Sequence, residues 1–243
     1  FLADRSGTQA AEKMRVDFVA NASHELLTPL AAIKGFIETL DDPAAGDDAA
    51  TRSRFLGIMA TETNRMQALV RDLMSLSRIE AEKYDPPQTP VDFASIIMET
   101  VDHLRNSQKD RGADIAVDVT SDLPPVMGDV GQLRQLASNI LNNSMKYGHA
   151  GTPVSVSLTP SKSGAMINFA VTDVGDGIAP EHLPRLTERF YRVDSGRSRL
   201  VGGTGLGLSL VKHIVDRHRG HLEIRSILGK GTTVSILLPV AHS

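Results

Sequence analysis

The chain has 243 residues, 41% of them hydrophobic, so it is long enough to form two domains with buried cores. Its 26 basic and 29 acidic residues give a formal net charge of −3, which argues against nucleic acid as a partner. The absence of cysteine excludes disulfides and thiolate metal sites.

The first two predicted elements are long helices joined by a turn. The first covers residues 9–40, and the second follows the turn-forming run at 41–48. In each helix, stripe positions step by three and four residues, which predicts a hairpin. A lone hairpin leaves apolar surface uncovered, so we expect two copies to form a dimeric four-helix bundle; the alternative is packing on the rest of the same chain. The stripe positions are Val16, Val19, Ala22, Leu26, Leu30, Ile33, Ile37 and Leu40, then Phe55, Met59, Glu62, Met66, Leu69, Leu73 and Leu76.

His24 is a candidate nucleophile on the first helix. At roughly 100° per residue it lies about 160° from Leu26, and Thr28 shares its outward side. We expect the neighbouring Glu25 to hold one ring nitrogen and so make the other a better nucleophile. A lone exposed histidine is usually just a solvated surface residue, but this one has an acid and a hydroxyl beside it.

A proline-rich linker separates the hairpin from a second domain. The run 84–90 holds three prolines and cannot continue a helix. The predicted divisions are residues 1–8 as the end of an upstream region, 9–84 as the hairpin, 85–90 as the linker and 91–243 as the second domain. There we expect helices at 94–109, 130–147 and 204–218, with strands at 114–119, 154–158, 165–172, 222–226 and 232–239. This order predicts an α+β two-layer sandwich.

The predicted helix at 130–147 has an apolar side and a polar side. Three asparagines, Asn139, Asn142 and Asn143, lie on the polar side with Lys146. Asparagine is a poor helix former, so the cluster indicates a function. Amide oxygens suit Mg²⁺, and a lysine adds positive charge for phosphates. The alternative is an ordinary exposed polar face.

Two glycine runs complete the predicted site. One, at 173–177, follows a strand, and the other, at 202–207, opens a helix. Glycine lets the backbone approach a phosphate closely, and free amides at a helix start favour anions. Either run could instead be a simple turn, and Asp173 could be a strand-end cap.

The run Ser23-His24-Glu25-Leu26-Leu27-Thr28-Pro29-Leu30 resembles the phosphoacceptor box of sensor histidine kinases. This resemblance implies that His24 is autophosphorylated, that Glu25 assists proton removal, and that Thr28 positions water when a bound regulator is dephosphorylated. Leu27 stands where the family typically has arginine, which puts any contact made by that cation in doubt. Residues 14–40 look closest to sensors of the phosphate-regulon type.

The second domain resembles the ATP-binding domain of histidine kinases, within the ATPase superfamily of chaperones and type II topoisomerases. The resemblance implies that Asn143 coordinates Mg²⁺, that Asp173 accepts a hydrogen bond from the adenine amino group, and that Arg192 reaches the γ-phosphate. It makes 194–203 a lid that orders when ATP binds. Ser144 replaces the usual alanine. The implied ATP-binding residues are Asn139, Asn143, Lys146, Tyr147, Asp173, Gly175, Gly177, Arg192, Gly203, Thr204, Gly205, Leu206 and Gly207.

The implied function is ATP-dependent phosphorylation of His24, followed by transfer to an aspartate in a response regulator receiver domain, together with regulator phosphatase activity. We expect this chain to be a cytoplasmic fragment of a membrane-associated parent. Two alternatives remain: a conformational ATPase that forms no phosphohistidine, and a docking or phosphatase module whose kinase activity is impaired, with Leu27 as the first suspect.

Overall fold

The computed structural model describes residues 5–82, 84–108, 110–193 and 203–241. It divides into two compact units, a helical unit that ends at Leu73 and a mixed unit that begins at Met74; Gly203 and Thr204 group with the first. No helix in the described part of the chain is long and apolar enough to span a lipid bilayer.

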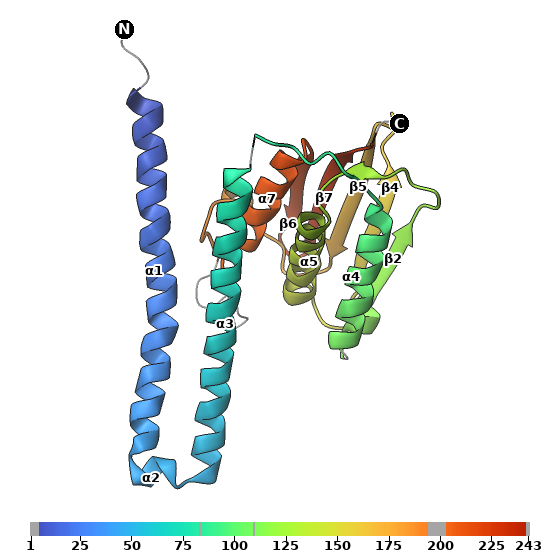
Figure 1. Cartoon of the computed structure of the whole chain (residues 1–243). Coiled ribbons are helices and arrows are strands. Elements are labelled where there is room, and N and C mark those ends of the chain that lie inside the picture. Colours follow the sequence, from blue (N-terminus) through green and yellow to red (C-terminus); the bar gives the residue numbers. More distant parts are fainter. Residues whose placement is uncertain (1–4, 83, 109, 194–202, 242–243) are drawn as a thin grey trace. The chain divides into compact units, whose positions relative to one another are not determined.

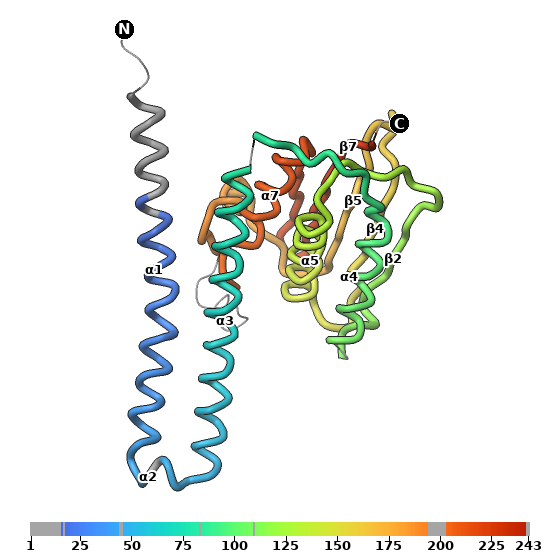
Figure 2. The backbone as a smooth tube through the Cα atoms, viewed as in Figure 1, coloured from blue at the N-terminus to red at the C-terminus, as the bar shows by residue number. Residues whose placement is uncertain are grey.

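The first unit is built on a helical hairpin (Figure 2). Helix α1 spans Arg5–Asp41 and helix α3 spans Ala49–Ala81, which confirms the predicted pair. The rings of Phe36 and Phe55 pack across the two helices with centroids 4.9 Å apart. Pro29 lies inside α1, which continues through it although proline supplies no N–H.

The connection between these helices differs from the prediction. The run 41–48 contains a short helix, α2, at Pro43–Gly46, rather than only a turn. The Gly46 N–H donates to the Asp42 carbonyl at 2.8 Å, which closes a helical turn. Asp48 then caps α3, because its Oδ2 accepts the Thr51 N–H at 2.9 Å; hydrogen bonds from the side chain and then the backbone of Thr51 lower the Asp48 pKa. Turn-forming residues therefore also serve here as helix caps.

The second unit is a five-stranded sheet with helices on one face (Figure 1). The strand order is β2-β4-β5-β7-β6; β2 pairs with β4 in parallel, and the other pairs are antiparallel. The predicted two-layer sandwich is confirmed. The strands are β2 Ile115–Val119, β4 Val154–Pro160, β5 Met166–Asp173, β6 His221–Ile227 and β7 Gly231–Pro239, and the helices are α4 Phe93–Ser107, α5 Val130–Tyr147 and α7 Gly207–Arg217.

The core lies between this sheet and its helices. Phe169 of β5 is fully buried and meets Phe93 of α4 edge to face, with ring centroids 5.6 Å apart. On α5 the apolar side faces this core, which leaves the asparagine side outward as predicted. The buried α5 residues include Leu133, Leu136, Ala137, Ile140, Leu141 and Ser144.

Some element boundaries needed correction. The helix expected from 204 begins at Gly207, because Gly205 has a φ of +73° that no α-helix accommodates. The short strands β1, Pro90–Val91, and β3, Val126–Met127, pair antiparallel and were not predicted. The 3₁₀ turns η1, Gly112–Asp114, and η2, Pro180–Arg185, were also missed. Elements of two to six residues carry too little periodicity to be recognised.

Candidate functional site

His24 lies on the exposed side of α1, as the helical spacing predicted. Thr28 is exposed as well, and its hydroxyl donates to the His24 carbonyl at 3.0 Å. The Ser23 hydroxyl donates in the same way to Val19, at 2.8 Å. Both hydroxyl protons are thus used within the helix, and the imidazole meets solvent. This position suits a nucleophile that a second domain or another protein must reach.

The carboxylate of Glu25 contacts the opposite helix. Its Oε2 accepts a hydrogen bond from Nη2 of Arg65, on α3, at 3.0 Å. Arg65 also lies 3.7 Å from a second acid, Glu62, one turn earlier on α3. Sequence reasoning missed Arg65, although its spacing of three from Glu62 was a usable signal. The role expected for Glu25 at the His24 ring remains a prediction.

The hairpin carries an exposed apolar surface. Five of its large apolar side chains are 50–62% exposed among the residues that the structure describes. Leu27, at the position where the family has arginine, is similarly exposed. The five are Val16, Val19, Leu30, Ile37 and Leu56.

In the second unit, the asparagine side of α5 meets the start of α7. The Asn139 amide donates to the carbonyl of Gly207, the first residue of α7, at 3.4 Å. Asn143 lies one turn further along α5 and is half-buried. Asn142 bonds within its own helix, to Ser138 at 2.8 Å. Asn139 therefore joins the two segments that were predicted to bind nucleotide. Asn142 is exposed and bonds within its own helix instead.

The last turn of α5 carries a cation against an aromatic ring. Nζ of Lys146 lies 4.9 Å from the centre of the Tyr147 ring. Both residues lie at the helix end, where the Gly148 backbone forms a bridge with Gly175. The first glycine run therefore lies beside the residues that the sequence assigned to nucleotide.

Asp173 is a buried acid at the end of β5. Burial raises the pKa of its carboxyl group, while hydrogen bonds from Thr232 and Ser144 act in the opposite direction. The Thr232 N–H donates to Oδ1 at 3.3 Å, in the register that pairs β5 with β7. Asp173 thus ties the strand ends together, as the strand-end alternative supposed. Its role in adenine recognition remains a prediction.

Neighbouring backbone lies so close to residues 175 and 177 that both positions require glycine. A Cβ at Gly175 would lie 2.4 Å from the Tyr147 carbonyl oxygen. Gly177 has a φ of +68°, and a Cβ there would lie 2.1 Å from the Ile227 carbonyl oxygen. No other residue fits at either position without moving the backbone. The two glycines hold the ends of α5 and β6 against one segment.

The second glycine run is braced by the segment that contains Phe190. The Phe190 N–H donates to the Gly205 carbonyl at 2.9 Å, and a Cβ at Gly205 would lie 2.9 Å from the Phe190 Cα. Leu206 is fully buried in the core. Gly203, Thr204 and Arg192 are half-buried. The predicted lid lies outside the described residues except for Gly203.

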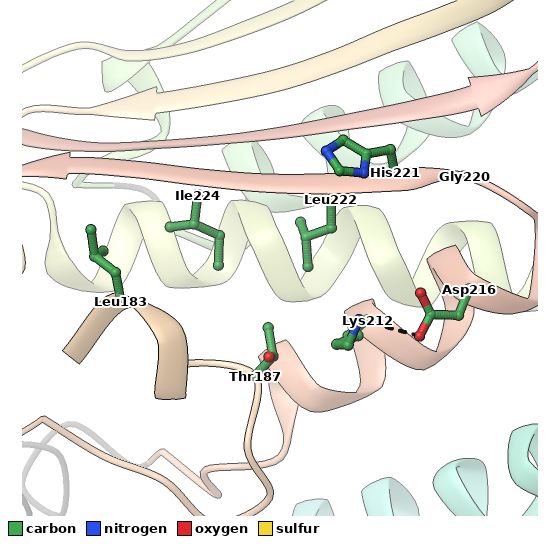
Figure 3. Close-up of a pocket in the computed structure, with 8 residues that line it drawn as sticks. All are labelled: Leu183, Thr187, Lys212, Asp216, Gly220, His221, Leu222 and Ile224. Atoms are coloured by element: carbon green, nitrogen blue, oxygen red, sulfur yellow. Dashed lines mark ion pairs between the residues drawn. The ribbon is translucent and has the colours of Figure 1, made fainter. Parts of the chain in front are cut away.

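A separate pocket of 250 Å³ opens between η2, α7 and β6 (Figure 3). Lys212 and Asp216 form an ion pair of 3.4 Å at its edge, and Leu222 and Ile224 of β6 line the opposite wall. None of the residues assigned to nucleotide lines this pocket. Within the described residues, no group of three acids or histidines could hold a metal ion. A cation at α5 would therefore have to be coordinated by amide oxygens of the helix and by oxygens of the nucleotide.

Two family models match the chain. Residues 14–82 match the His Kinase A (phospho-acceptor) domain, and residues 128–242 match the histidine kinase-, DNA gyrase B-, and HSP90-like ATPase. The first range contains His24, and the second contains every residue assigned to nucleotide. The second unit is therefore an ATP-binding domain of this superfamily.

Curated relatives agree with both matches. The phosphate regulon sensor protein PhoR of Pseudomonas aeruginosa is 42% identical over 91% of this chain and 49% of its own length. The sensor-like histidine kinase SenX3 of Mycobacterium tuberculosis is 38% identical over 98% of this chain and 57% of its own. The chain thus spans about half the length of the curated relatives it matches.

Solved structures extend the comparison to the fold. The mycobacterial sensor histidine kinase MprB is 30% identical, with a TM-score of 0.53 over 64% of this chain and 99% of its own. ShkA in complex with AMPPNP is 27% identical, with a TM-score of 0.65 over 93% of this chain and 46% of its own. Both family models and these relatives agree that the chain belongs to the sensor histidine kinases of two-component systems.

Proposed function

We propose that this chain uses Mg-ATP to phosphorylate His24 and then passes the phosphoryl group to an aspartate in the receiver domain of a response regulator. The observation that carries the proposal is an exposed imidazole, beside a hydroxyl and an acid, in the same chain as an ATPase domain. The names of the relatives support the same reading, since they include sensor proteins and histidine kinases.

The residues of the second unit fit a nucleotide. Helix α7 has 11 residues and begins at Gly207, so its first N–H groups are available to an anion. Asn139 holds this helix start against α5, and Lys146 lies further along the same helix. Asn143 would hold Mg²⁺ through its amide oxygen, in keeping with the preference of this ion for oxygen ligands, and the ion would neutralise charge on the phosphates.

In the proposed transfer, a ring nitrogen of His24 forms a bond to the γ-phosphorus. The bond from that phosphorus to the bridging oxygen breaks, and ADP leaves with the electron pair. The proton on the other ring nitrogen passes to a base, and Glu25 is the nearest candidate along the chain. Lys146 and Arg192 supply positive charge toward the phosphates. We assign Thr28 to the regulator phosphatase activity, in which its hydroxyl oxygen positions water during dephosphorylation of the regulator.

We also propose that the working form is a homodimer. The exposed apolar side chains of α1 and α3 need cover, and a second copy supplies a matching surface by symmetry. Four helices would then bury the exposed apolar side chains of both hairpins in one bundle.

Labelling with γ-labelled ATP and Mg²⁺ tests the proposed function. The full chain should acquire acid-labile label, as expected of a phosphohistidine, and His24→Gln should acquire none. Binding of ATP without any label in the unsubstituted chain would contradict the kinase assignment and favour a conformational ATPase or a docking module.

A further inference from the structure

The turn that follows α5 is joined to the first glycine run by backbone and by side chain. The His149 N–H donates to the Val174 carbonyl at 2.8 Å, and Gly148 forms an isolated bridge with Gly175. Nε2 of His149 also lies 2.9 Å from Oδ1 of Asp176, within hydrogen-bond distance. The turn and the glycine run both belong to the second unit.

A second set of contacts holds the turn from its other side. The Arg111 guanidinium donates through Nη2 to the His149 carbonyl at 3.1 Å, and its Nε pairs with Asp114 at 3.2 Å. Oδ2 of Asp114 accepts the Gly151 N–H at 3.2 Å. The Thr152 hydroxyl donates to the His149 carbonyl at 2.7 Å. The backbone of His149 is therefore fixed, and its imidazole reaches the glycine run from a fixed point.

The strength of the contact between His149 and Asp176 depends on the charge of the imidazole. A carboxylate only accepts hydrogen bonds, so the ring nitrogen must donate, either as neutral imidazole or as imidazolium. The charged donor forms the stronger hydrogen bond, and histidine ordinarily changes charge between about pH 5 and 8. The two side chains are 53% and 54% exposed, so water screens the pair and its contribution is modest.

His149 also influences Asp173, the acid assigned to the adenine amino group. Burial raises the pKa of the Asp173 carboxyl group, hydrogen bonds from Thr232 and Ser144 lower it, and the charge of His149 lowers it further. An ionised carboxylate is the better acceptor for an amino group. Among the described residues, the charged groups that these contacts bring to His149 are Arg111, Asp114, Asp173 and Asp176. The imidazolium thus favours the form of Asp173 that accepts.

We propose that His149 is a positioning residue of the nucleotide site, whose imidazolium clamps residues 173–177 through Asp176 in the geometry that binds adenine. This inference rests on the proposed use of ATP. The glycine run carries the adenine acceptor at its first position, so a shift of the run also shifts the acceptor. The clamp makes ATP affinity depend on pH, and it acts through the glycine run rather than through contact with the nucleotide.

The test compares the MgATP affinity of the unsubstituted chain with that of His149→Gln. Glutamine keeps a neutral N–H donor without the charge, and the titrations of ATP and of the other histidines cancel in the ratio of the two affinities. The unsubstituted chain should bind about threefold more tightly at pH 6, the factor typical of an exposed ion pair, and equally at pH 8.5. His149→Lys keeps a charge at both pH values and should bind tightly at both. Titration calorimetry of the whole chain measures each affinity.

Two further variants separate positioning from structural damage. Asp176→Asn should lower the affinity at pH 6 to that of His149→Gln, and in this background His149→Gln should have much less effect than it has alone. Glu223→Gln removes a carboxylate from an exposed ion pair with Arg225 on β6, and it should leave the affinity unchanged at both pH values. Thermal unfolding at both pH values identifies any variant that fails to fold.

The affinity result is independent of whether His24 is phosphorylated. A ratio that falls from pH 6 to pH 8.5 and is lost in Asp176→Asn would support the clamp even if no phosphohistidine formed, which would overturn only the proposed function. The same ratio at both pH values would reduce His149 to a structural role and overturn the clamp, as would a chain that binds no ATP.

Discussion

His218 shows how a single residue joins two elements of the ATP-binding domain. It is buried; its Nδ1 lies 2.7 Å from the Ile214 carbonyl oxygen, and its Nε2 accepts the Asp129 N–H at 3.1 Å. Asp129 in turn caps α5, the helix that carries the asparagines. Both ring nitrogens are satisfied only in the neutral form with the proton on Nδ1.

Stability should therefore depend on pH through this histidine. Burial lowers the His218 pKa below its ordinary value of 6.5, so the unfolded chain binds the proton more readily than the folded one. The contribution is complete above pH 6.5 and is lost as the pH falls toward the folded-state pKa. The loss for this one group is at most about 1.4 kcal/mol per pH unit.

The measurement is chemical denaturation between pH 5 and 8. The unsubstituted chain should lose stability below pH 6.5, and His218→Gln should show a shallower loss over the same interval. His213 also has a pKa lowered by burial and adds in the same direction, so part of the slope should remain in the variant. Identical slopes for both proteins would contradict this role of His218.

At the scale of elements, the end of α3 packs as part of the second unit. Leu76 and Ile79 of its last turns are buried, while Met74 is exposed. The Arg217 guanidinium, from the last turn of α7, pairs with the Glu82 carboxylate at 2.9 Å and donates to the Glu82 carbonyl at 3.2 Å. Arg189 pairs with Glu80 on the same stretch. These contacts make the end of α3 a structural part of the ATP-binding unit.

Shortening one buried side chain of this segment tests that conclusion. Leu76→Ala should destabilise the second unit by about 2–5 kcal/mol, the usual cost of emptying a buried leucine site. Met74→Ala, two residues earlier and exposed, is the matched control and should cost little. Calorimetry of both variants checks the prediction, and equal melting temperatures would show that this turn does not stabilise the unit.

Prediction from sequence succeeded where periodicity extends over many residues. The helix predicted at 130–147 has the observed bounds, because its apolar and polar sides alternate over several turns. Elements fixed by a few local bonds, such as α2 and the β1–β3 pair, were not recoverable. The structure brings the predicted glycine and asparagine runs together, but the contact of Arg65 was not predicted. Its partner Glu25 lies 40 residues away in the sequence, so only the folded hairpin reveals the contact.

At the scale of the whole molecule, the exposed stripe predicts association of two copies. Ile37→Asp places a charge on that surface and should shift the chain from dimer to monomer, because an unpaired carboxylate would be buried between copies. Light scattering across a concentration series measures the change. Glu38→Gln, at the adjacent exposed position, should leave the mass unchanged. A monomeric unsubstituted chain at all concentrations would contradict the proposed bundle.

The central claim is that a nucleotide site in the second unit serves a nucleophile in the first. The most direct test is the ATP affinity of two variants, measured by titration calorimetry with Mg²⁺ and paired with γ-phosphate labelling. His24→Gln should bind ATP like the unsubstituted chain but acquire no label. Asn143→Asp should lose most of its affinity, because an added negative charge near the phosphates opposes binding, and should lose label with it. Unchanged affinity in Asn143→Asp, or label that persists in His24→Gln, would contradict the account.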